Sequence, residues 1–434
     1  MPVVEEPAAA AAVRPRSDLR IAVYGALANN MYNLAKLLAR AGHDVTYVRE
    51  PDTYPMSQPL WEDVEWTFDP QRLPDDQPSL GEWRALEAEL QWERPPWVVD
   101  TDGVHVSRAK KFARAMRLAP RLDPRLLSQL RWYNALYAGT IEHLRSRDWV
   151  IACGPGVIAA YMAGTPYLYW PFGGDVAIMP WRDGSAADRF VARGIRLAVR
   201  HAPAAGSHDP NINRSLRKLG CREPGWYQFI VDTDRYRPRG DDEPGPLAAD
   251  VRERAGDRLV LFMASRQDFE WKGSDRFLAA FARVARETSE LFLVMTPWGN
   301  DLARSQRLLV DAGLEGSFHV LPGLPSKPLL RRLFWAADVV VDQFVLGSFG
   351  TVALEAMACN RPVLMHIDEA LFAEGPPASY PPPPVLHAAT EDEIAAVLRE
   401  LAAGRVDLGA AGARARAWVV EHHGPQHLSK YLPA

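Results

Sequence analysis

Short apolar runs alternate along the chain with stretches in which apolar residues recur at helical spacing. Residues 21–25 form an apolar run that ends at a glycine, and residues 31–41 carry apolar side chains on one helical face. Gly42 stands where a glycine commonly closes a helix, and residues 45–48 begin the next apolar run. This pattern predicts a strand, a helix and a parallel strand at the start of the chain.

A second series of the same kind follows the proline- and acid-rich segment 237–246. Its expected strands are residues 259–264, 291–295, 339–341 and 363–365, and its expected helices are residues 274–287, 302–312 and 351–359. Strands that alternate with helices are typical of parallel sheets covered by helices on both faces. We therefore expect an α/β protein with two doubly wound, Rossmann-like domains that face each other across a cleft.

The domain boundaries follow from these two series. We expect a disordered tail at 1–18, an N-terminal domain at 19–236, a linker at 237–250 and a C-terminal domain at 251–408. Residues 409–434 are expected to form a C-terminal helix that could cross back to the first domain.

Composition excludes several classes of protein. Of the 434 residues, 47% are apolar and 24% charged, which argues against disorder and coiled coil, and a net charge of −4 argues against a nucleic-acid binder. The three cysteines are far apart and form no C-x-x-C pair, so neither a disulfide framework nor a zinc knuckle is expected.

Nothing in the sequence indicates export or membrane insertion. The first residues are acidic where a signal peptide needs basic ones, and the uncharged stretch 149–174 is interrupted at Gly154, Pro155, Gly156, Gly164, Pro166 and Pro171. That stretch predicts a strand, a turn, a short helix and a strand. We expect a cytoplasmic location.

A glycine-containing loop provides the clearest local signal. Gly347-Ser348-Phe349-Gly350 leads into the helix expected from Thr351, so the N–H groups and the positive end of the helix dipole suit a phosphate. Glu355, one turn further on, could reach a ribose hydroxyl. The alternative is a plain glycine turn with Glu355 capping the helix.

Two cations follow the first strand of the second domain. Arg266 and Lys272 lie on its strand-to-helix loop, where a bidentate guanidinium and a point charge could hold a diphosphate without a metal. Such residues are often merely solvated, but this loop and the glycine loop both end at the same crevice. A nucleoside diphosphate ligand is therefore the favoured interpretation.

These residues resemble the donor half of retaining GT-B glycosyltransferases of the glycogen-synthase-like family four. The matching positions are Arg266, Lys272-Gly273 and Glu355-Ala-Met-Ala, and Asp342-Gln343 is similar to a variant branch of that family. Fainter similarity extends to residues 38–45, 173–175 and 231–238. The resemblance implies transfer of a sugar from a nucleoside diphosphate sugar, with retention and without cofactor or metal.

The resemblance and the loop positions together give the expected site. The expected catalytic residues are Arg266, Lys272, Glu355 and Asp175. The expected donor-binding residues are Gly273, Trp298, Gly323, Gly347, Ser348, Phe349, Gly350, Thr351 and Val352. The expected acceptor-side residues are Gly25, Asn29, Asn30, Gly173 and Gly174. The nucleobase is expected near residues 321–324.

Two positions depart from the family pattern. Gly347 stands where the family has a glutamate that contacts the donor sugar, and Phe172 stands where a histidine often precedes the Gly-x-Asp element. These departures keep two alternatives open: a sugar-nucleotide epimerase or hydrolase on the same fold, and a protein that binds nucleotide sugars without turnover.

Other motifs carry less weight. Asp232-Thr-Asp234 has the spacing of a metal motif but coincides with the domain junction, so no metal is expected there. His422 and His423 have no ligand-spaced partner and are interpreted as a surface pair.

The acceptor is predicted from two stretches of opposite charge. Residues 61–94 hold ten acidic and three basic residues with four tryptophans, which favours a soluble, amino-bearing acceptor. Residues 108–131 hold eight basic residues and one acidic residue, but Pro120 and Pro124 weaken a membrane-binding helix. Both stretches could also be solvated surface. We expect a soluble small-molecule acceptor, and the oligomeric state stays open.

Overall fold

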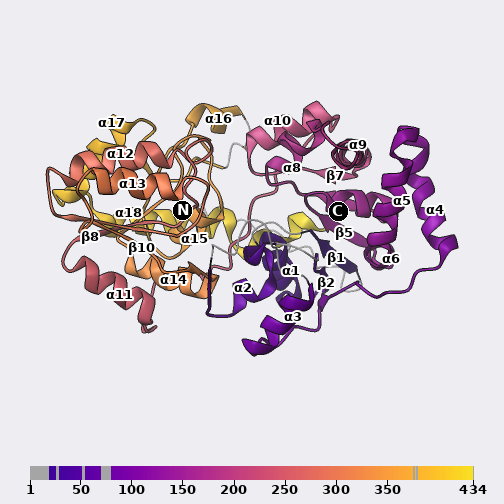
Figure 1. Ribbon diagram of the computed structural model, residues 1–434, viewed down its shortest axis with the longest axis horizontal. Coiled ribbons are helices and arrows are strands. Elements are labelled where there is room, and N and C mark those ends of the chain that lie inside the picture. Colours follow the sequence, from indigo (N-terminus) through magenta and orange to yellow (C-terminus); the bar gives the residue numbers. More distant parts are fainter. Residues whose placement is uncertain are drawn as a thin grey trace, which may run out of the picture.

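The computed structural model describes residues 19–25, 29–50, 54–69, 80–374, 377 and 380–433. The tail expected to be disordered, 1–18, lies outside this part of the chain. Two α/β domains lie next to each other, the N-terminal one in indigo to pink and the C-terminal one in orange to yellow (Figure 1).

The N-terminal domain is built on a parallel sheet of order β4-β2-β1-β5-β6-β7. Its strands are β1 (Arg20–Tyr24), β2 (Asp44–Val48), β4 (Val98–Val99), β5 (Trp149–Ala152), β6 (Tyr167–Tyr169) and β7 (Ala204–Ala205). Its helices are α1 (Asn30–Arg40), α2 (Pro59–Asp63), α3 (Leu80–Glu89), α4 (Arg108–Leu118), α5 (Leu127–Leu136), α6 (Ala138–Arg145), α7 (Gly156–Ala163), α8 (Gly174–Ala177), α9 (Ala186–His201) and α10 (Pro210–Leu219). The strand order reverses direction between β1 and β5.

The C-terminal sheet repeats this order as β10-β9-β8-β12-β13-β14, again parallel. Its strands are β8 (Leu259–Met263), β9 (Leu291–Met295), β10 (Phe318–Val320), β12 (Val339–Val341), β13 (Val363–Met365) and β14 (Leu386–His387). Its helices are α11 (Pro246–Ala255), α12 (Ser274–Ala285), α13 (Leu302–Asp311), α14 (Lys327–Ala336), α15 (Thr351–Ala358), α16 (Glu369–Glu374), α17 (Glu391–Ala402) and α18 (Leu408–His423). The expected fold class, two doubly wound α/β domains, is confirmed.

The strands are apolar on both faces because helices cover both sides of each sheet. In β8, Val260 and Phe262 face one buried cluster while Leu261 and Met263 face another, as the two-residue period of a strand requires. The first of these clusters also contains Val23 of the N-terminal sheet. Apolar packing is thus continuous between the domains.

Two segments cross the domain boundary. β3 (Thr67–Phe68) of the N-terminal domain pairs antiparallel with β11 (Leu324–Pro325) of the C-terminal domain. After α18, the 3-10 helix η6 (Pro425–Tyr431) returns to the N-terminal domain, where Trp149 Nε1 donates a hydrogen bond of 2.9 Å to the carbonyl of Tyr431. The C-terminus accordingly lies beside the N-terminal sheet (Figure 1).

Both charged stretches contain helices. The acidic stretch contains α2 and α3, and the basic stretch ends α4 at Leu118 and resumes as α5 at Leu127, after Pro120 and Pro124. Among the described residues, no helix is long and apolar enough to cross a membrane.

The interpretation of His423 as a surface residue was wrong. Its side chain is fully buried, and its ring lies within hydrogen-bond distance of the Phe229 carbonyl (2.7 Å) and the Tyr380 hydroxyl (2.6 Å). Burial lowers the pKa of His423 well below its usual value. The crossing of the last helix between the domains, which local sequence does not show, buries this imidazole.

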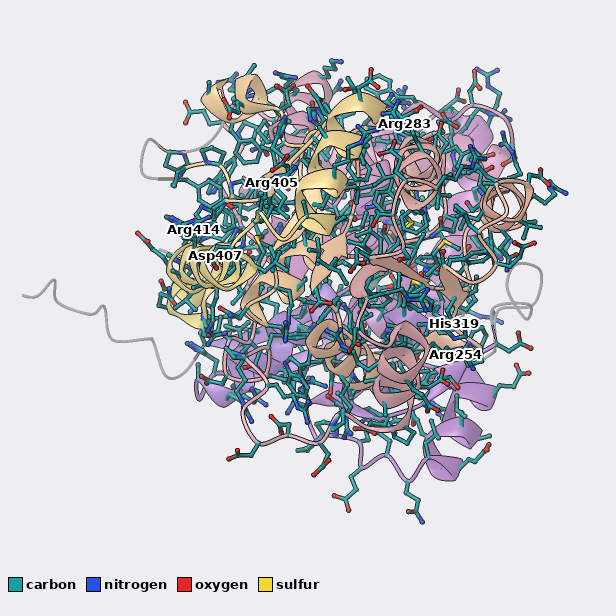
Figure 2. The ribbon with its side chains drawn as sticks, turned by 90° about the vertical axis from the view of Figure 1, so that its left-hand side faces the viewer. Arg254, Arg283, His319, Arg405, Asp407 and Arg414 are labelled. Atoms are coloured by element: carbon teal, nitrogen blue, oxygen red, sulfur yellow. The ribbon has the colours of Figure 1, made fainter. Side chains whose placement is uncertain are left out.

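The outer end of the C-terminal domain carries several ion pairs. Arg254, Arg283 and Arg405 lie on this end (Figure 2). They contact Asp250, Asp392 and Glu400 at 2.8, 2.9 and 2.6 Å, respectively. Exposed pairs of this kind add little stability but balance the charge of the surface.

Candidate functional site

The strand order sets where a ligand can bind. In a doubly wound sheet the crevice lies at the carboxyl ends of the strands on either side of the point where the order reverses. For the C-terminal sheet these are the loops after β8 and β12, which contain residues 264–273 and 342–350. The sequence-predicted cations and the glycine loop are therefore brought to one edge.

Arg266 is oriented by a neighbour on its own loop. Its Nε donates to Asp268 Oδ2 at 2.8 Å, and Asp268 also accepts from the backbone N–H of Trp271 at 2.8 Å. Because 42% of the Arg266 side chain is exposed, the guanidinium remains accessible to a ligand. A loop fixed in this way offers a positioned cation at the carboxyl end of β8.

Lys272 is connected to the glycine loop and to the N-terminal domain. Its Nζ donates to Gln343 Oε1 at 2.9 Å and contacts Asp342 Oδ1 at 3.3 Å. Gln343 Nε2 donates to the carbonyl of Ser348, and Ser348 Oγ donates to Asp209 Oδ2 at 2.9 Å. The Asp-Gln pair of the sequence thus holds the lysine and the glycine loop together.

The glycine loop has a shape that excludes a side chain at its first position. Gly347 has φ +67°, and a Cβ there would lie 2.6 Å from Cβ of Asp368. Gly350, at the start of α15, has φ −109°, and a Cβ there would meet no atom within 4 Å. The family's glutamate could therefore not replace Gly347 without moving Asp368.

The side chains of Ser348 and Phe349 are buried and engaged within the protein. Ser348 is 4% exposed and is bonded to Asp209. Phe349 is equally buried among the aromatic rings of His208, Phe372, Trp418 and His423. This packing leaves the backbone of these two residues, and not their side chains, for a donor.

Glu355 is paired with a residue that sequence reasoning missed. Both of its oxygens accept from Lys327 Nζ at 2.6 Å, and only 4% of Glu355 is exposed. Burial raises the pKa of Glu355 even though the Lys327 charge opposes that rise. The sequence position of Lys327 could have indicated this pair. Lys327 begins α14, where the helix dipole disfavours a cation, so a carboxylate partner is favoured there.

A cavity of about 130 Å³ lies between the domains next to this pair. Trp298, Thr351 and Val352 line it from the C-terminal domain, and Met56 and Trp61 close it from the N-terminal domain. The remaining lining residues are Ala264, Thr296, Leu324, Pro325, Lys327 and Leu330. Leu324 belongs to the segment expected near the nucleobase, whereas the contribution of Trp61 and Met56 was missed.

Pairing of β3 with β11 brings that N-terminal segment over the cavity. Ser326 and Trp66 exchange hydrogen bonds of 3.0 and 3.1 Å beside this pair, and Trp61 packs edge-on against Trp66. Gly323 also lies here, since a Cβ on it would be 3.1 Å from Cβ of Thr67. No local pattern shows this long-range strand pairing.

Asp175 organises the loop after β6. Its Oδ1 accepts from the backbone N–H groups of Phe172 and Gly173 at 3.2 and 2.9 Å, and its Oδ2 accepts from Gly154 N–H at 3.1 Å and Tyr169 OH at 3.2 Å. Burial raises its pKa. Both oxygens of Asp175 are bonded within the protein, so Asp175 holds the loop after β6 in place. Its expected catalytic contact stays a prediction.

The expected acceptor-side residues lie at the matching edge of the N-terminal sheet. Gly25 ends β1 with φ +109°, and a Cβ there would be 2.7 Å from the carbonyl oxygen of Cys153, which follows β5. Asn29 is buried and its Nδ2 donates to the carbonyl of Gln58 at 3.0 Å. Asn30 begins α1, while Gly173 and Gly174 begin α8.

The Asp-x-Asp motif is used for packing at the domain junction. Asp232 pairs with Arg40 and also accepts from the backbone N–H of Arg235 at 3.2 Å. In the described part of the chain, no group of three or more His, Cys, Asp or Glu side chains has the arrangement of a metal site.

Several described carboxylates of the acidic stretch are paired within the protein, whereas Glu89 and Glu93 are exposed. Glu62 accepts from Arg235 at 3.0 Å, and Glu87 accepts from Arg94 at 2.6 Å. Asp63 pairs with Lys36. Charges neutralised in this way do not favour a cationic ligand, and residues 70–79 lie outside the described part of the chain.

Comparison with solved structures defines the class of architecture. The chain superposes on HepE of Anabaena in complex with UDP and glucose with a TM-score of 0.59 at 14% identity, over 95% of this chain and 97% of that one. It superposes on sucrose-phosphate synthase of Thermosynechococcus elongatus with a TM-score of 0.56 at 15% identity, over 95% and 96%. These likenesses show the two-domain GT-B fold.

Comparison of sequences defines the C-terminal domain further. Residues 248–370, which include Arg266, Lys272 and Glu355, match the family of glycosyl transferases group 1. The chain is 32% identical over 193 residues to the D-inositol 3-phosphate glycosyltransferase of Thermomonospora curvata (42% of this chain, 41% of that protein). It is 33% identical over 191 residues to that of Rhodococcus jostii (41% and 37%). The chain thus spans about two fifths of the length of these curated relatives.

The shape of the glycine loop gives a first prediction. Gly347→Ala should destabilise the protein by at least about 2 kcal/mol, because alanine pays about 1–2 kcal/mol for a left-handed backbone and its Cβ would meet Asp368. Gly350→Ala is the matched control and should cost less than about 1 kcal/mol. Urea unfolding measures both, and equal losses would contradict the backbone explanation.

The buried pair gives a second prediction. Lys327→Met should lower the free energy of unfolding by about 3–5 kcal/mol at pH 7, because Glu355 is left buried without a partner. A carboxyl whose pKa is higher in the folded than in the unfolded state lowers the free energy of unfolding as pH rises. The difference in unfolding free energy between wild type and Lys327→Met should therefore be smaller at pH 5 than at pH 7. The double variant Lys327→Met/Glu355→Gln should recover most of the stability at pH 7. A loss that is independent of pH would refute the pairing.

Proposed function

We propose that this protein is a glycosyltransferase that moves a sugar from a nucleoside diphosphate sugar to a soluble small-molecule acceptor, with retention and without a metal. The observation that carries the proposal is the meeting of Arg266, Lys272 and the N-terminus of α15 at one sheet edge, beside the cavity between the domains. The group 1 match of residues 248–370 supports the same conclusion.

Electrostatic stabilisation is the main contribution of the protein in this mechanism. As the bond between the sugar C1 and the diphosphate oxygen breaks, negative charge grows on the leaving diphosphate. Arg266 and Lys272 offset that charge, and the first N–H groups of α15 add donors. Since Lys272 is already held by Gln343 and Asp342, it needs little reorganisation during the reaction.

Retention follows from attack on the face that the leaving group vacates. The acceptor hydroxyl oxygen forms the new bond to C1, and its proton passes to an oxygen of the departing diphosphate. Because the leaving diphosphate accepts the proton, this route needs no separate carboxylate base. It agrees with Asp175 and Glu355 being engaged with protein donors.

Aromatic and apolar groups of the cavity serve the nucleoside. Trp61, Trp298 and Leu324 line the cavity, and indole rings suit stacking on a base. HepE, which shares the fold, was solved with UDP and glucose, so UDP-glucose is the first donor to try.

The acceptor enters from the N-terminal domain, by way of the loops that follow β1 and β6. Gly25, Asn29 and Gly173 stand at that edge of the sheet. Because Glu62, Asp63 and Glu87 are already paired with cations of the protein, we propose an acceptor chosen by shape and hydroxyl groups and not by positive charge. The phosphorylated polyol named for the relatives falls within this class of soluble small molecules.

The transfer assay that tests the proposal uses the full chain with candidate nucleotide sugars, with and without acceptors, followed by mass spectrometry. We expect a glycosylated acceptor and free nucleoside diphosphate, and the same yield in EDTA. An isomerised donor would identify an epimerase, free sugar a hydrolase, and an unaltered donor a binding protein. Activity lost in EDTA and restored by Mg²⁺ or Mn²⁺ would overturn the metal-independent mechanism.

The two cations give a further prediction. Arg266→Ala and Lys272→Ala should each lower turnover about a hundredfold, since a lost contact to a developing charge costs about 2–4 kcal/mol in the transition state. Arg254→Ala, on the outer end of the same domain, is the control and should leave turnover unchanged. Thermal melting checks folding, and Lys272→Ala is repeated with Asp342→Asn so that no carboxylate is left unpaired. Near wild-type turnover in either cation variant would refute its contribution.

A further inference from the structure

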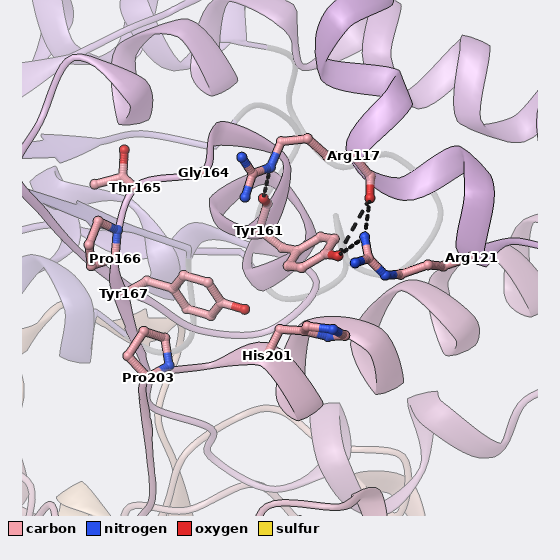
Figure 3. A pocket seen from close by; sticks show the side chains of 9 residues that line it. All are labelled: Arg117, Arg121, Tyr161, Gly164, Thr165, Pro166, Tyr167, His201 and Pro203. Atoms are coloured by element: carbon pink, nitrogen blue, oxygen red, sulfur yellow. Dashed lines mark hydrogen bonds between the residues drawn. The ribbon is translucent and has the colours of Figure 1, made fainter.

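A large hollow lies on the N-terminal domain away from the cleft. It has a volume of about 550 Å³ and is lined by residues of α4, α7, α9 and the loops that precede β6 and β7 (Figure 3). Loops that precede parallel strands lie at their amino ends, whereas the proposed active site lies at the carboxyl ends. The hollow is therefore on the opposite edge of the sheet from the cleft.

A second hollow of about 450 Å³ continues the first, and the two share Arg117, Gly164, Thr165 and Pro166. We call the two together the arginine groove. Apart from two tyrosines, its charged and ionisable lining residues are Arg117, Arg121, Arg145, Arg147, Asp148 and His201. Four arginines thus face one carboxylate.

The one carboxylate of the arginine groove, Asp148, is already paired with Arg20. Asp148 accepts from Arg20 through two side-chain hydrogen bonds, Nε at 3.0 Å and Nη2 at 2.8 Å. Arg147 lies 3.9 Å from Asp44, at the limit of an ion pair, and its buried Nε has no hydrogen-bond partner among the described residues. The positive charge of the arginine groove is therefore largely unbalanced by the protein.

The fold holds two of these arginines in place. Arg117 Nε donates to the carbonyl of Tyr161 at 3.2 Å, and its guanidinium crosses Gly164, where a Cβ would lie 2.4 Å from Nη1. Arg121 Nη1 donates to the hydroxyl of Tyr161 at 2.9 Å, so both guanidinium groups converge on one tyrosine (Figure 3). Cations positioned before a ligand arrives lose less entropy when they bind it.

The arginine groove differs from the ion pairs on the outer end of the C-terminal domain. On the outer end of the C-terminal domain, Arg254, Arg283 and Arg405 each have a carboxylate partner (Figure 2). Arginines gathered without carboxylates repel one another, and an anion relieves this repulsion. Guanidinium forks match the oxygens of phosphate in particular.

We propose that the arginine groove binds a phosphate-bearing group and is a second ligand site, separate from the cleft. The phosphate belongs either to a free small molecule or to the headgroup of a lipid, and the same residues would hold it in both cases. The site does not depend on the proposed transferase activity.

Binding of inorganic pyrophosphate to the full chain, measured by calorimetry at low salt, tests this site. Arg121→Gln/Arg145→Gln should weaken binding at least about tenfold, because each removes a charged hydrogen-bond donor. Arg108→Gln/Arg131→Gln removes the same net charge from exposed positions outside the groove and should leave binding within about twofold. Since the cleft also offers cations, Lys272→Ala is measured in parallel and should retain groove binding.

Vesicles of phosphatidylglycerol, tested by co-sedimentation with the same variants, separate the two sources of phosphate. Pyrophosphate binding without vesicle binding identifies a free phosphate compound, and vesicle binding that Arg121→Gln/Arg145→Gln abolishes identifies a lipid headgroup. Either result supports the site. Equal weakening by both double variants, loss of binding in Lys272→Ala, or no binding of either probe would overturn it.

Discussion

Apolar packing across the domain boundary is the constraint on which the rest of the structure depends. One buried cluster includes Val23 of the N-terminal sheet, Phe262 of the C-terminal sheet and Tyr431 near the end of the chain. Because both sheets contribute to it, their carboxyl edges are held facing each other, and the loops that carry the candidate site meet. Polar contacts such as Ser348 with Asp209 then fix how the loops align.

Sequence predicts the features that depend on local repetition. Strand and helix periods indicate the two sheets, and Arg266 and Lys272 can be proposed because a residue directly after a parallel strand must lie at the ligand edge. Lys327 and Glu355 are 28 residues apart, and Asp209 and Ser348 are 139 apart. The first contact is set by how α14 packs beside α15 within the C-terminal domain and the second by how the domains dock, and no local pattern encodes either.

The same reasoning explains the error at His423. The neighbours of His423 in sequence suggest a surface position, and Phe349 lies in the glycine loop. The return of the last helix to the first domain instead places both rings in one aromatic cluster. A buried imidazole with a lowered pKa remains neutral there, so it can pack against Phe349 without a charged partner.

If the protein has the proposed function, Gly347 removes one contact to the donor sugar, and other parts of the donor must supply the binding energy. A glutamate at this position would add a charged hydrogen bond to the sugar, worth about 1.5–3 kcal/mol. The positive φ of Gly347 and the closeness of Asp368 exclude that side chain. The donor then depends more on its two other parts: the diphosphate at Arg266 and Lys272, and the nucleoside in the cavity that Trp61 and Trp298 line. Since Trp61 reaches the cavity from the N-terminal domain, donor binding and domain docking support each other.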